Sequence, residues 1–264
     1  SFITTVGGTF ILGAASADKM VDFQNPIALN GAVRTVQVNR GSGAVDARLS
    51  GVLSGNASSH LTKTGAGTLT LSAANTYTGT TSINAGTLAV NGAIGGAVNV
   101  ANAAILGGSG SINGLVTVAA GGILAPGNSP GTLTMNSGLV LDASSILNFE
   151  LNAADNTIGS GINDLIDVTG NFTLAGILNV SGIGDFSTAA DNTKWRLFNY
   201  SGGVFTDNVL TLGTMPSVGS TGKYFQIDTA TAGQVNLVIV PEPGAIALAG
   251  IGIAAAAYAL RRRK

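Results

Sequence analysis

Seven acidic side chains between residues 142 and 191 are the residues best able to do chemistry. They are Asp142, Glu150, Asp155, Asp164, Asp167, Asp185 and Asp191. Two carboxyl groups that converge on one face can act as general acid and general base on a glycosidic bond. A carbohydrate-active enzyme (a polysaccharide lyase or a glycoside hydrolase) is therefore the enzymatic hypothesis. Carboxyl groups about 5–10 Å apart in an open groove would favour it, and scattered acids would favour a non-enzymatic role.

Asp164 and Asp167 follow the glycine-containing segment 159–163 and could share one loop. Carboxylate and carbonyl oxygens in such a loop are the ligands that Ca²⁺ prefers. The spacing matches no defined calcium-binding loop, and solvated turn acids explain the pair more simply. We therefore expect no cofactor, and structural calcium at these two residues is the alternative.

Other catalytic residue types are scarce. The chain has no cysteine and one histidine, His60, with no nucleophile or orienting carboxylate close to it in the sequence. We interpret His60 as a solvated turn residue. The glycine-rich runs 92–96 and 107–110 lack the Lys-Ser/Thr pair of a phosphate-binding loop, so they are assigned to turns. The sequence predicts that the chain is not an enzyme.

The distribution of charge argues against nucleic acid as a partner. The net charge is −1, but four of the twelve basic side chains are the last four of the chain. The rest of the chain therefore holds eight basic side chains against 13 acidic ones. No basic face remains that could follow a phosphate backbone.

The middle of the chain predicts many short strands. The whole stretch between Lys63 and Asp142 lacks a charged side chain, a histidine or a cysteine. Apolar residues there occupy every second position, the period of a strand with one buried face. The alternating segments are 68–71, 87–90, 97–100, 115–118 and 132–135.

The spacing of these segments predicts a β-solenoid. Their first residues lie 19, 10, 18 and 17 positions apart, and a Gly-Thr-Leu triplet begins at Gly67, Gly86 and Gly131. A recurrence of roughly 17–20 residues corresponds to one solenoid coil. Stacked coils bury a continuous aliphatic column that a single coil cannot bury alone. An antiparallel sandwich is the alternative all-β fold.

The amino-acid composition changes after Asp142, where aromatic and acidic residues become frequent. A solenoid needs a cap that blunts its open end against edge-to-edge pairing. Bulky aromatic side chains would cover the last coil. We therefore predict a β-helix region at residues 1–184 and a C-terminal β cap at residues 185–239.

Residues 61–88 carry a specific pattern. Its positions are Lys63, Gly65, Gly67, Leu69, Leu71, Asn75, Tyr77, Gly79, Gly86 and Leu88. The pattern resembles the autotransporter-associated β-strand repeat of bacterial passenger proteins, with the best match at 61–90. Weaker similarity extends over roughly residues 20 to 180. The resemblance implies an exported, right-handed parallel β-helix without catalytic residues. We expect the chain to begin within a longer strand-rich protein or in its mature form.

The C-terminal segment 240–264 has three parts. The motif Val240-Pro241-Glu242-Pro243 is followed by the apolar segment 244–260 and by Arg261, Arg262, Arg263 and Lys264. This order resembles a second family, the PEP-CTERM sorting signals that exosortase-type membrane enzymes recognise. A helix of that apolar segment would span about 26 Å, close to the thickness of a bilayer core. The basic cluster would stay cytoplasmic. Residues 240–264 are thus predicted to be a sorting tail with one transmembrane helix.

Together these features predict an all-β, exported protein of the bacterial cell surface or extracellular space, with a structural or adhesive role. The membrane, an exosortase-type enzyme and extracellular polysaccharide or other surface material are the expected partners. A carbohydrate-active β-helix enzyme remains the alternative.

Overall fold

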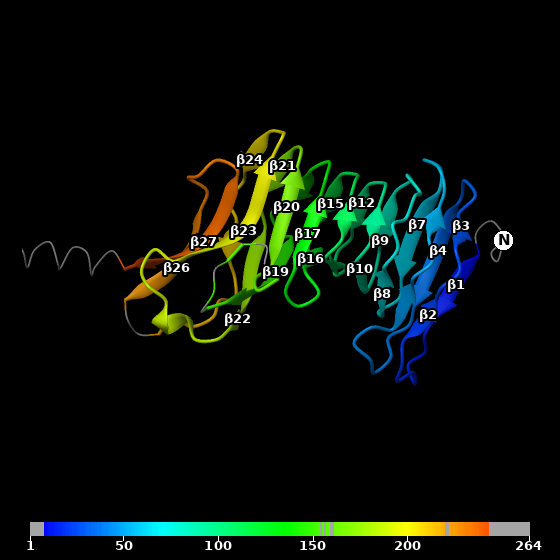
Figure 1. The fold of residues 1–264 in the computed structure, drawn as a ribbon, viewed down its shortest axis with the longest axis horizontal. Coiled ribbons are helices and arrows are strands. Elements are labelled where there is room, and N and C mark those ends of the chain that lie inside the picture. Colours follow the sequence, from blue (N-terminus) through cyan, green and yellow to red (C-terminus); the bar gives the residue numbers. More distant parts are fainter. Residues whose placement is uncertain (1–7, 154, 156, 159–160, 220–221, 243–264) are drawn as a thin grey trace, which may run out of the picture.

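The computed structural model describes residues 8–153, 155, 157–158, 161–219 and 222–242. Figure 1 shows an elongated stack of short strands that runs from β1 at one end to β26 and β27 at the other. Each coil of the chain contributes one strand to each of two or three sheets, and the next coil lies against it. The described residues are almost entirely strand and turn, with one short 3₁₀ turn at Phe186–Thr188.

Two nine-stranded parallel sheets run the length of the stack. The first sheet contains β1 (Thr9–Leu12), β4 (Val33–Val38), β7 (His60–Thr64), β9 (Thr81–Ile83), β12 (Val98–Val100), β15 (Val116–Val118), β18 (Leu139–Leu141), β21 (Phe172–Leu174) and β24 (Phe205–Asp207). The second sheet contains β2 (Val21–Phe23), β5 (Ala47–Leu49), β8 (Thr68–Leu71), β10 (Thr87–Val90), β13 (Ile105–Gly108), β16 (Ile123–Pro126), β19 (Ile146–Asn152), β22 (Ile177–Ile183) and β25 (Thr211–Leu212).

A third sheet closes the coils from the middle of the chain onward. It contains β11 (Ala93–Ile94), β14 (Ser111–Ile112), β17 (Thr132–Met135), β20 (Leu165–Thr169), β23 (Lys194–Ser201), β27 (Gln234–Pro241) and β26 (Lys223–Asp228). The short pair β3 (Ile27–Ala28) and β6 (Leu53–Ser54) closes the first two coils. Stacked parallel sheets of this kind are the architecture of a β-solenoid, so the predicted all-β solenoid is confirmed. The predicted right hand of the coil remains a prediction.

Register shows how long each coil is. Thr81 pairs with Val98, and Val98 pairs with Val116. Both steps match the predicted period of roughly 17–20 residues in the charge-free middle of the chain. Leu139 pairs with Phe172, so the coil that joins them is nearly twice as long. Part of the extra length is strand β19, which is longer than the strands before it in the second sheet.

A single column of leucines joins the coils inside the second sheet. Each leucine pairs in register with the next. The members of this leucine ladder are Leu69, Leu88, Leu106, Leu124, Leu147, Leu178 and Leu212. The first six are fully buried, and Leu212 in the edge strand is 38% exposed. Burying one such side chain contributes about 1.5–3 kcal/mol, and a single coil supplies only one face of each contact.

The Gly-Thr-Leu triplets are not all equivalent. Thr68 and Thr87 pair in register in the second sheet, as the shared triplet predicts. The triplet that begins at Gly131 instead enters β17 of the third sheet. Short aliphatic strands on any of the three faces satisfy the same local pattern, so the triplet alone does not identify the sheet.

Glycine allows the backbones to approach closely at one corner of the repeat. Gly65 and Gly86 have φ of +75° and +65°. A Cβ on Gly65 would lie 2.3 Å from the Val38 carbonyl oxygen, and one on Gly86 would lie 2.5 Å from the Gly65 carbonyl oxygen. Any other residue would clash with the neighbouring coil and adopt a strained backbone.

The end of the stack that follows β22 combines parallel and antiparallel pairing. β23, β24 and β25 continue the parallel stacking of the coils before them. β27 then pairs antiparallel with both β23 and β26. Aromatic side chains fill this end, where Trp195 is fully buried and contacts Phe186 and Phe225. The division into a region 1–184 and a cap 185–239 stays a proposal.

Among the residues with described positions, no helix is long and apolar enough to cross a membrane. The predicted transmembrane helix, residues 244–260, lies outside the described residues.

Lys63 of the repeat pattern is buried inside the solenoid. Its Nζ donates hydrogen bonds to the carbonyl oxygens of Thr64, Gly65 and Ala85 at 3.0, 2.8 and 2.9 Å. These oxygens belong to two successive coils, so the ammonium group ties one corner to the next. Burial lowers the pKa of Lys63 from 10.5 to about 8. The negative charge of Asp46 opposes this shift, but its effect on the pKa is smaller. The lysine is therefore a structural donor.

We expect Lys63→Met to lower the free energy of unfolding by about 1–3 kcal/mol, because three corner carbonyl groups lose their donor while the side-chain volume is kept. Urea unfolding followed by far-UV circular dichroism measures the change. The matched control is Lys19→Met, because Lys19 is exposed. An unchanged urea midpoint for Lys63→Met would contradict the assignment.

Candidate functional site

The polar residues of the repeat pattern bind the backbone. The Asn75 Oδ1 accepts a hydrogen bond from the Leu53 amide at 2.9 Å, and its Nδ2 donates to the carbonyl oxygens of Ala73 and Ala93, both at 3.0 Å. These partners lie on three successive coils. Buried polar groups need such partners, and here the partners also fix the stacking of the coils. Asn75 therefore has a structural role.

Tyr77 in the repeat and Asp46 in the coil before it are also buried and hydrogen-bonded. The Tyr77 hydroxyl lies 2.6 Å from the Thr81 hydroxyl, and burial raises the pKa of Tyr77. Asp46 accepts hydrogen bonds from the amides of Gly41 and Thr68, both at 2.7 Å. A carboxylate that accepts two backbone N–H groups is held in place.

His60 does not lie in a turn. It begins strand β7 and is half-buried, and its Nδ1 accepts a hydrogen bond from the Thr80 amide at 2.9 Å. The interpretation of His60 as a solvated turn residue is therefore wrong. Residues 54–59 have the composition of a turn, so the sequence predicts that His60 belongs to that turn. It is instead the first residue of β7, which pairs with β4.

Most of the seven candidate acids are dispersed over turns and outer faces. Asp142, Asp155 and Asp185 each accept a hydrogen bond from a backbone amide two residues later. Asp191 forms an ion pair with Lys223. These four acids have local partners, and in the part of the chain that the structure describes they do not share a groove.

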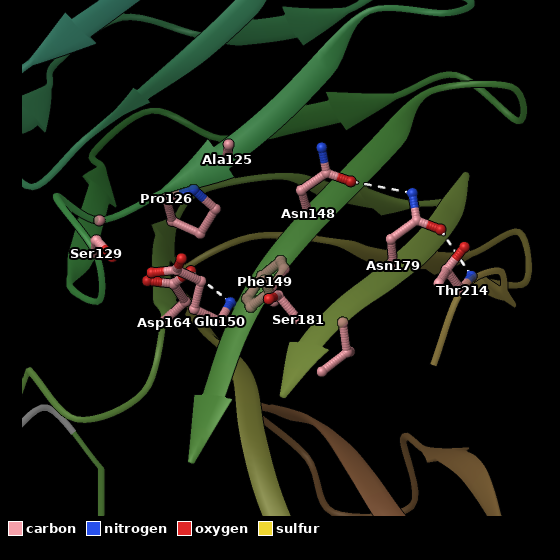
Figure 2. A pocket seen from close by; sticks show the side chains of 12 residues that line it. Ala125, Pro126, Ser129, Asn148, Phe149, Glu150, Asp164, Asn179, Ser181 and Thr214 are labelled. Atoms are coloured by element: carbon pink, nitrogen blue, oxygen red, sulfur yellow. Dashed lines mark hydrogen bonds between the residues drawn. The ribbon is translucent and has the colours of Figure 1, made fainter. Parts of the chain in front are cut away.

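Glu150 and Asp164 are the exception, because both line one groove on the second sheet. The groove has a volume of about 630 Å³. Its lining residues are Ala125, Pro126, Gly127, Ser129, Asn148, Phe149, Glu150, Asp164, Asn179, Val180, Ser181 and Thr214. Figure 2 shows both acidic side chains among the residues that line the groove.

Both carboxylate oxygens of Asp164 bind the protein backbone. The residue is 1% exposed, and its two carboxylate oxygens accept hydrogen bonds from the amides of Gly131 at 2.9 Å and Glu150 at 2.7 Å. Burial raises the pKa of Asp164 from 3.8 to about 7, and the nearby charge of Glu150 adds to that rise. The side chain fastens the loop after β16 to strand β19.

The alternative calcium site at Asp164 and Asp167 is not assembled. The Asp167 carboxylate accepts a hydrogen bond from the Asn199 amide group at 2.7 Å on the third sheet, and it lines a separate hollow. Across the described ranges, no group of three or more His, Cys, Asp or Glu side chains is placed to hold a metal ion.

Sequence reasoning did not identify the remaining groove residues. Asn148 and Asn179 pair in register, and the Asn179 Nδ2 donates to the Asn148 Oδ1 at 3.0 Å. Their separation in the sequence is well beyond the period of roughly 17–20 residues expected for a coil. A search for equivalent asparagines at a longer period would have found them.

The sorting motif begins inside the last strand. Val240 and Pro241 end β27, where they pair with Tyr224 and Lys223 of β26. The exposed Glu242 follows, and its amide donates to the Gly222 carbonyl oxygen at 2.6 Å. Pro243 and the basic residues 261–264 lie outside the described residues. The motif thus starts as an extended segment held by an antiparallel neighbour.

The raised pKa of Asp164 predicts a pH dependence of stability. The folded chain holds this proton more tightly than the unfolded chain, so the folded state binds more protons between about pH 4 and pH 7. The resulting stabilisation is complete below about pH 4 and is lost as the pH rises through about 7. We expect Asp164→Asn to remove this part of the change in urea midpoint with pH.

The control for this measurement is Asp18→Asn, because Asp18 is an exposed carboxyl. Its urea midpoint should follow that of the unaltered chain over the whole pH interval. A profile for Asp164→Asn that runs parallel to that of the unaltered chain would show that Asp164 does not titrate in this interval.

Two curated bacterial proteins share sequence with part of this chain. The adhesin BmaC autotransporter of Brucella suis biovar 1 (strain 1330) is 45% identical over 115 residues, which are 43% of this chain and 3% of that protein. The extracellular serine protease of Serratia marcescens is 40% identical over 121 residues, which are 46% of this chain and 11% of that protein. The matched segments are small parts of both relatives.

Two family models match at the places where the sequence pattern predicts. The passenger-associated-transport-repeat matches residues 61–90, which include β8, β9 and β10 and most of β7. The PEP-CTERM protein-sorting motif matches residues 240–264. The resemblances to a passenger repeat and to a sorting signal are both confirmed. This chain therefore carries a passenger-associated-transport-repeat in its solenoid and a PEP-CTERM protein-sorting motif at residues 240–264.

Proposed function

We propose that this chain is an exported, non-enzymatic protein of the bacterial cell surface, in which the solenoid serves as a stiff spacer and an adhesive or structural surface. The observation that carries the proposal is the combination of a passenger-type repeat and a sorting motif in one chain. The similarity to an autotransporter adhesin supports a surface location and makes adhesion the favoured role.

The polar surface of the coils supports this role. Outward positions in the middle of the chain carry uncharged residues such as Ser82, Asn99 and Thr117, one above the other in the first sheet. Repeated amide and hydroxyl groups at a spacing of about 4.8 Å can make many weak contacts with hydroxyl-rich material. We propose extracellular polysaccharide or other cell-surface material as the partner.

The groove on the second sheet is the observation that favours the enzymatic alternative, because Glu150 and Asp164 both line it. Glycoside hydrolysis needs two carboxyl groups that both reach the bond to be cleaved. Asp164 is buried, and two backbone amides occupy its oxygens. This arrangement argues against a carboxylate pair that works on a sugar chain. The serine protease similarity covers 11% of that protein, so it carries no activity to this chain.

For the tail, we propose that residues 244–260 form a helix in the cytoplasmic membrane, that residues 261–264 anchor it on the cytoplasmic side, and that an exosortase-type enzyme recognises Val240-Pro241-Glu242-Pro243. The sorting-motif match supports this interpretation. We further propose a right-handed coil for residues 1–184 and a β cap for residues 185–239. Pairing of Val240 with Tyr224 implies that β26 and β27 must separate locally before an enzyme can enclose the motif.

Cell fractionation with mass spectrometry of the C-terminus tests the proposal. In a host with the sorting enzyme, we expect the chain to reach the cell surface or the medium without the residues after about Pro243. Alanine at Pro241, Glu242 and Pro243 together should keep residues 261–264 on the chain and hold it in the membrane fraction. Lys19→Ala, an exposed change far from the tail, is the control. Recovery of the unaltered chain in the cytosol with an intact tail would overturn the proposal.

A further inference from the structure

The groove on the second sheet has a floor built from two unusually long strands. β19 and β22 are seven residues each and pair along their full length. Because side chains alternate, Phe149 and Val180 point into the core while Asn148, Glu150 and Ser181 point outward. Glu150 pairs in register with Ser181. Polar side chains of both strands therefore face the groove.

One wall of the groove is locked in place. Pro126 and Ser129 belong to the segment that runs from the end of β16 to Gly131, whose amide donates to the Asp164 carboxylate. A Cβ on Gly127 would lie 2.4 Å from the Asp164 Oδ1, so the loop and the carboxylate are packed as closely as a glycine allows. The groove is preformed, which limits the ordering that binding requires.

The other side of the groove fixes the direction of the side-chain amides. The Asn148 Oδ1 accepts from Asn179, and the Asn179 Oδ1 accepts from the Thr214 amide at 2.8 Å. Figure 2 shows this run of side chains along the groove. Because the Asn148 Oδ1 faces Asn179, the N–H groups of the Asn148 Nδ2 point away from Asn179.

Three polar groups on the floor have no hydrogen bond to any residue that the structure describes. They are the Asn148 Nδ2, the Glu150 carboxylate and the Ser181 hydroxyl. They supply a donor, an acceptor and a group that can do either. Neighbouring positions lie about 5 Å apart across the strands and about 7 Å apart along them. Such a set suits a ligand with several hydroxyl groups.

The charged residues that line the groove indicate which class of ligand can bind there. Glu150 and Asp164 are the ionisable residues of the lining, and no lysine or arginine is among the described residues that line it. A negatively charged sugar such as a uronate would be repelled, whereas an ammonium group beside Glu150 would form a charge-assisted hydrogen bond. Phe149 is buried, so its ring is not available for stacking against a ligand.

We propose that this groove is a glycan-binding site that takes amino-sugar chains, with Glu150 binding the ammonium group and Asn148 and Ser181 binding hydroxyl groups. The inference rests on the proposed surface function and names the ligand class of one site within it. The site binds its ligand without cleaving it, because Asp164 holds the wall and its carboxyl group does not reach the ligand.

Isothermal titration calorimetry of the full chain tests the proposal with three probes: a glucosamine tetramer, the neutral N-acetylglucosamine tetramer and a galacturonate tetramer. We expect the glucosamine tetramer to bind most tightly, the neutral tetramer more weakly and the galacturonate tetramer not measurably. Binding of the glucosamine tetramer should weaken as salt is added, because an exposed ion pair is screened.

Variants assign the contacts. Glu150→Gln should weaken binding of the glucosamine tetramer about tenfold or more and abolish its salt dependence, and Asn148→Ala should weaken binding of both amino-sugar probes. Asp18→Asn removes an exposed carboxyl elsewhere and should bind like the unaltered chain. Far-UV circular dichroism of each variant checks that it is folded.

The proposal fails if the three probes bind equally, if the galacturonate tetramer binds best, if none binds, or if Glu150→Gln binds glucosamine like the unaltered chain. Release of reducing ends from either amino-sugar probe would also overturn it in favour of an enzyme. Each of these results leaves the fractionation experiment untouched, because a chain can be sorted to the surface whether or not this groove binds sugar.

Discussion

The stacking of one coil on the next through the leucine ladder is the interaction on which the rest of the structure depends. A coil as short as the one that joins Val98 to Val116 cannot bury its own inner face, so every coil is stable only against its neighbours. That requirement explains the sequence of the middle region. A charged side chain on the inner face would face leucine from both adjacent coils, and the stretch between Lys63 and Asp142 contains none.

The polar groups inside the stack obey the same constraint. Lys63 and Asn75 each bind backbone groups on more than one coil, so they join the coils where backbone pairing is interrupted at a corner. Where the coil lengthens between β18 and β21, the ladder continues from Leu147 to Leu178. Asp164 holds the loop after β16 against strand β19, and residues of both line one groove. The regular core thus brings together Glu150 and Asp164, two of the seven candidate acids.

The sequence predicted the strands of the middle region because period-two alternation and turn glycines are local signals. The sorting motif and the repeat were also recognisable, since both are short and specific. Three features were not predictable. His60 enters a strand because β4 lies beside it. The triplet at Gly131 goes to the third sheet, which coil closure decides. The groove depends on Asn148 and Asn179 meeting across one of the longer coils, and no local pattern encodes that register.

The register of adjacent coils can be measured directly, because the chain contains no cysteine. Ser82 and Asn99 are partners on adjacent coils, whereas Ser82 and Thr117 are two coils apart. Cysteines at the first pair lie about 4.8 Å apart at their Cα atoms, within the range of a disulfide, and those at the second pair lie about 9.6 Å apart, outside it. Thiol titration and mass spectrometry under mild oxidation should find a disulfide in Ser82→Cys/Asn99→Cys and free thiols in Ser82→Cys/Thr117→Cys. The opposite result, or equal cross-linking of both, would contradict coil-on-coil stacking.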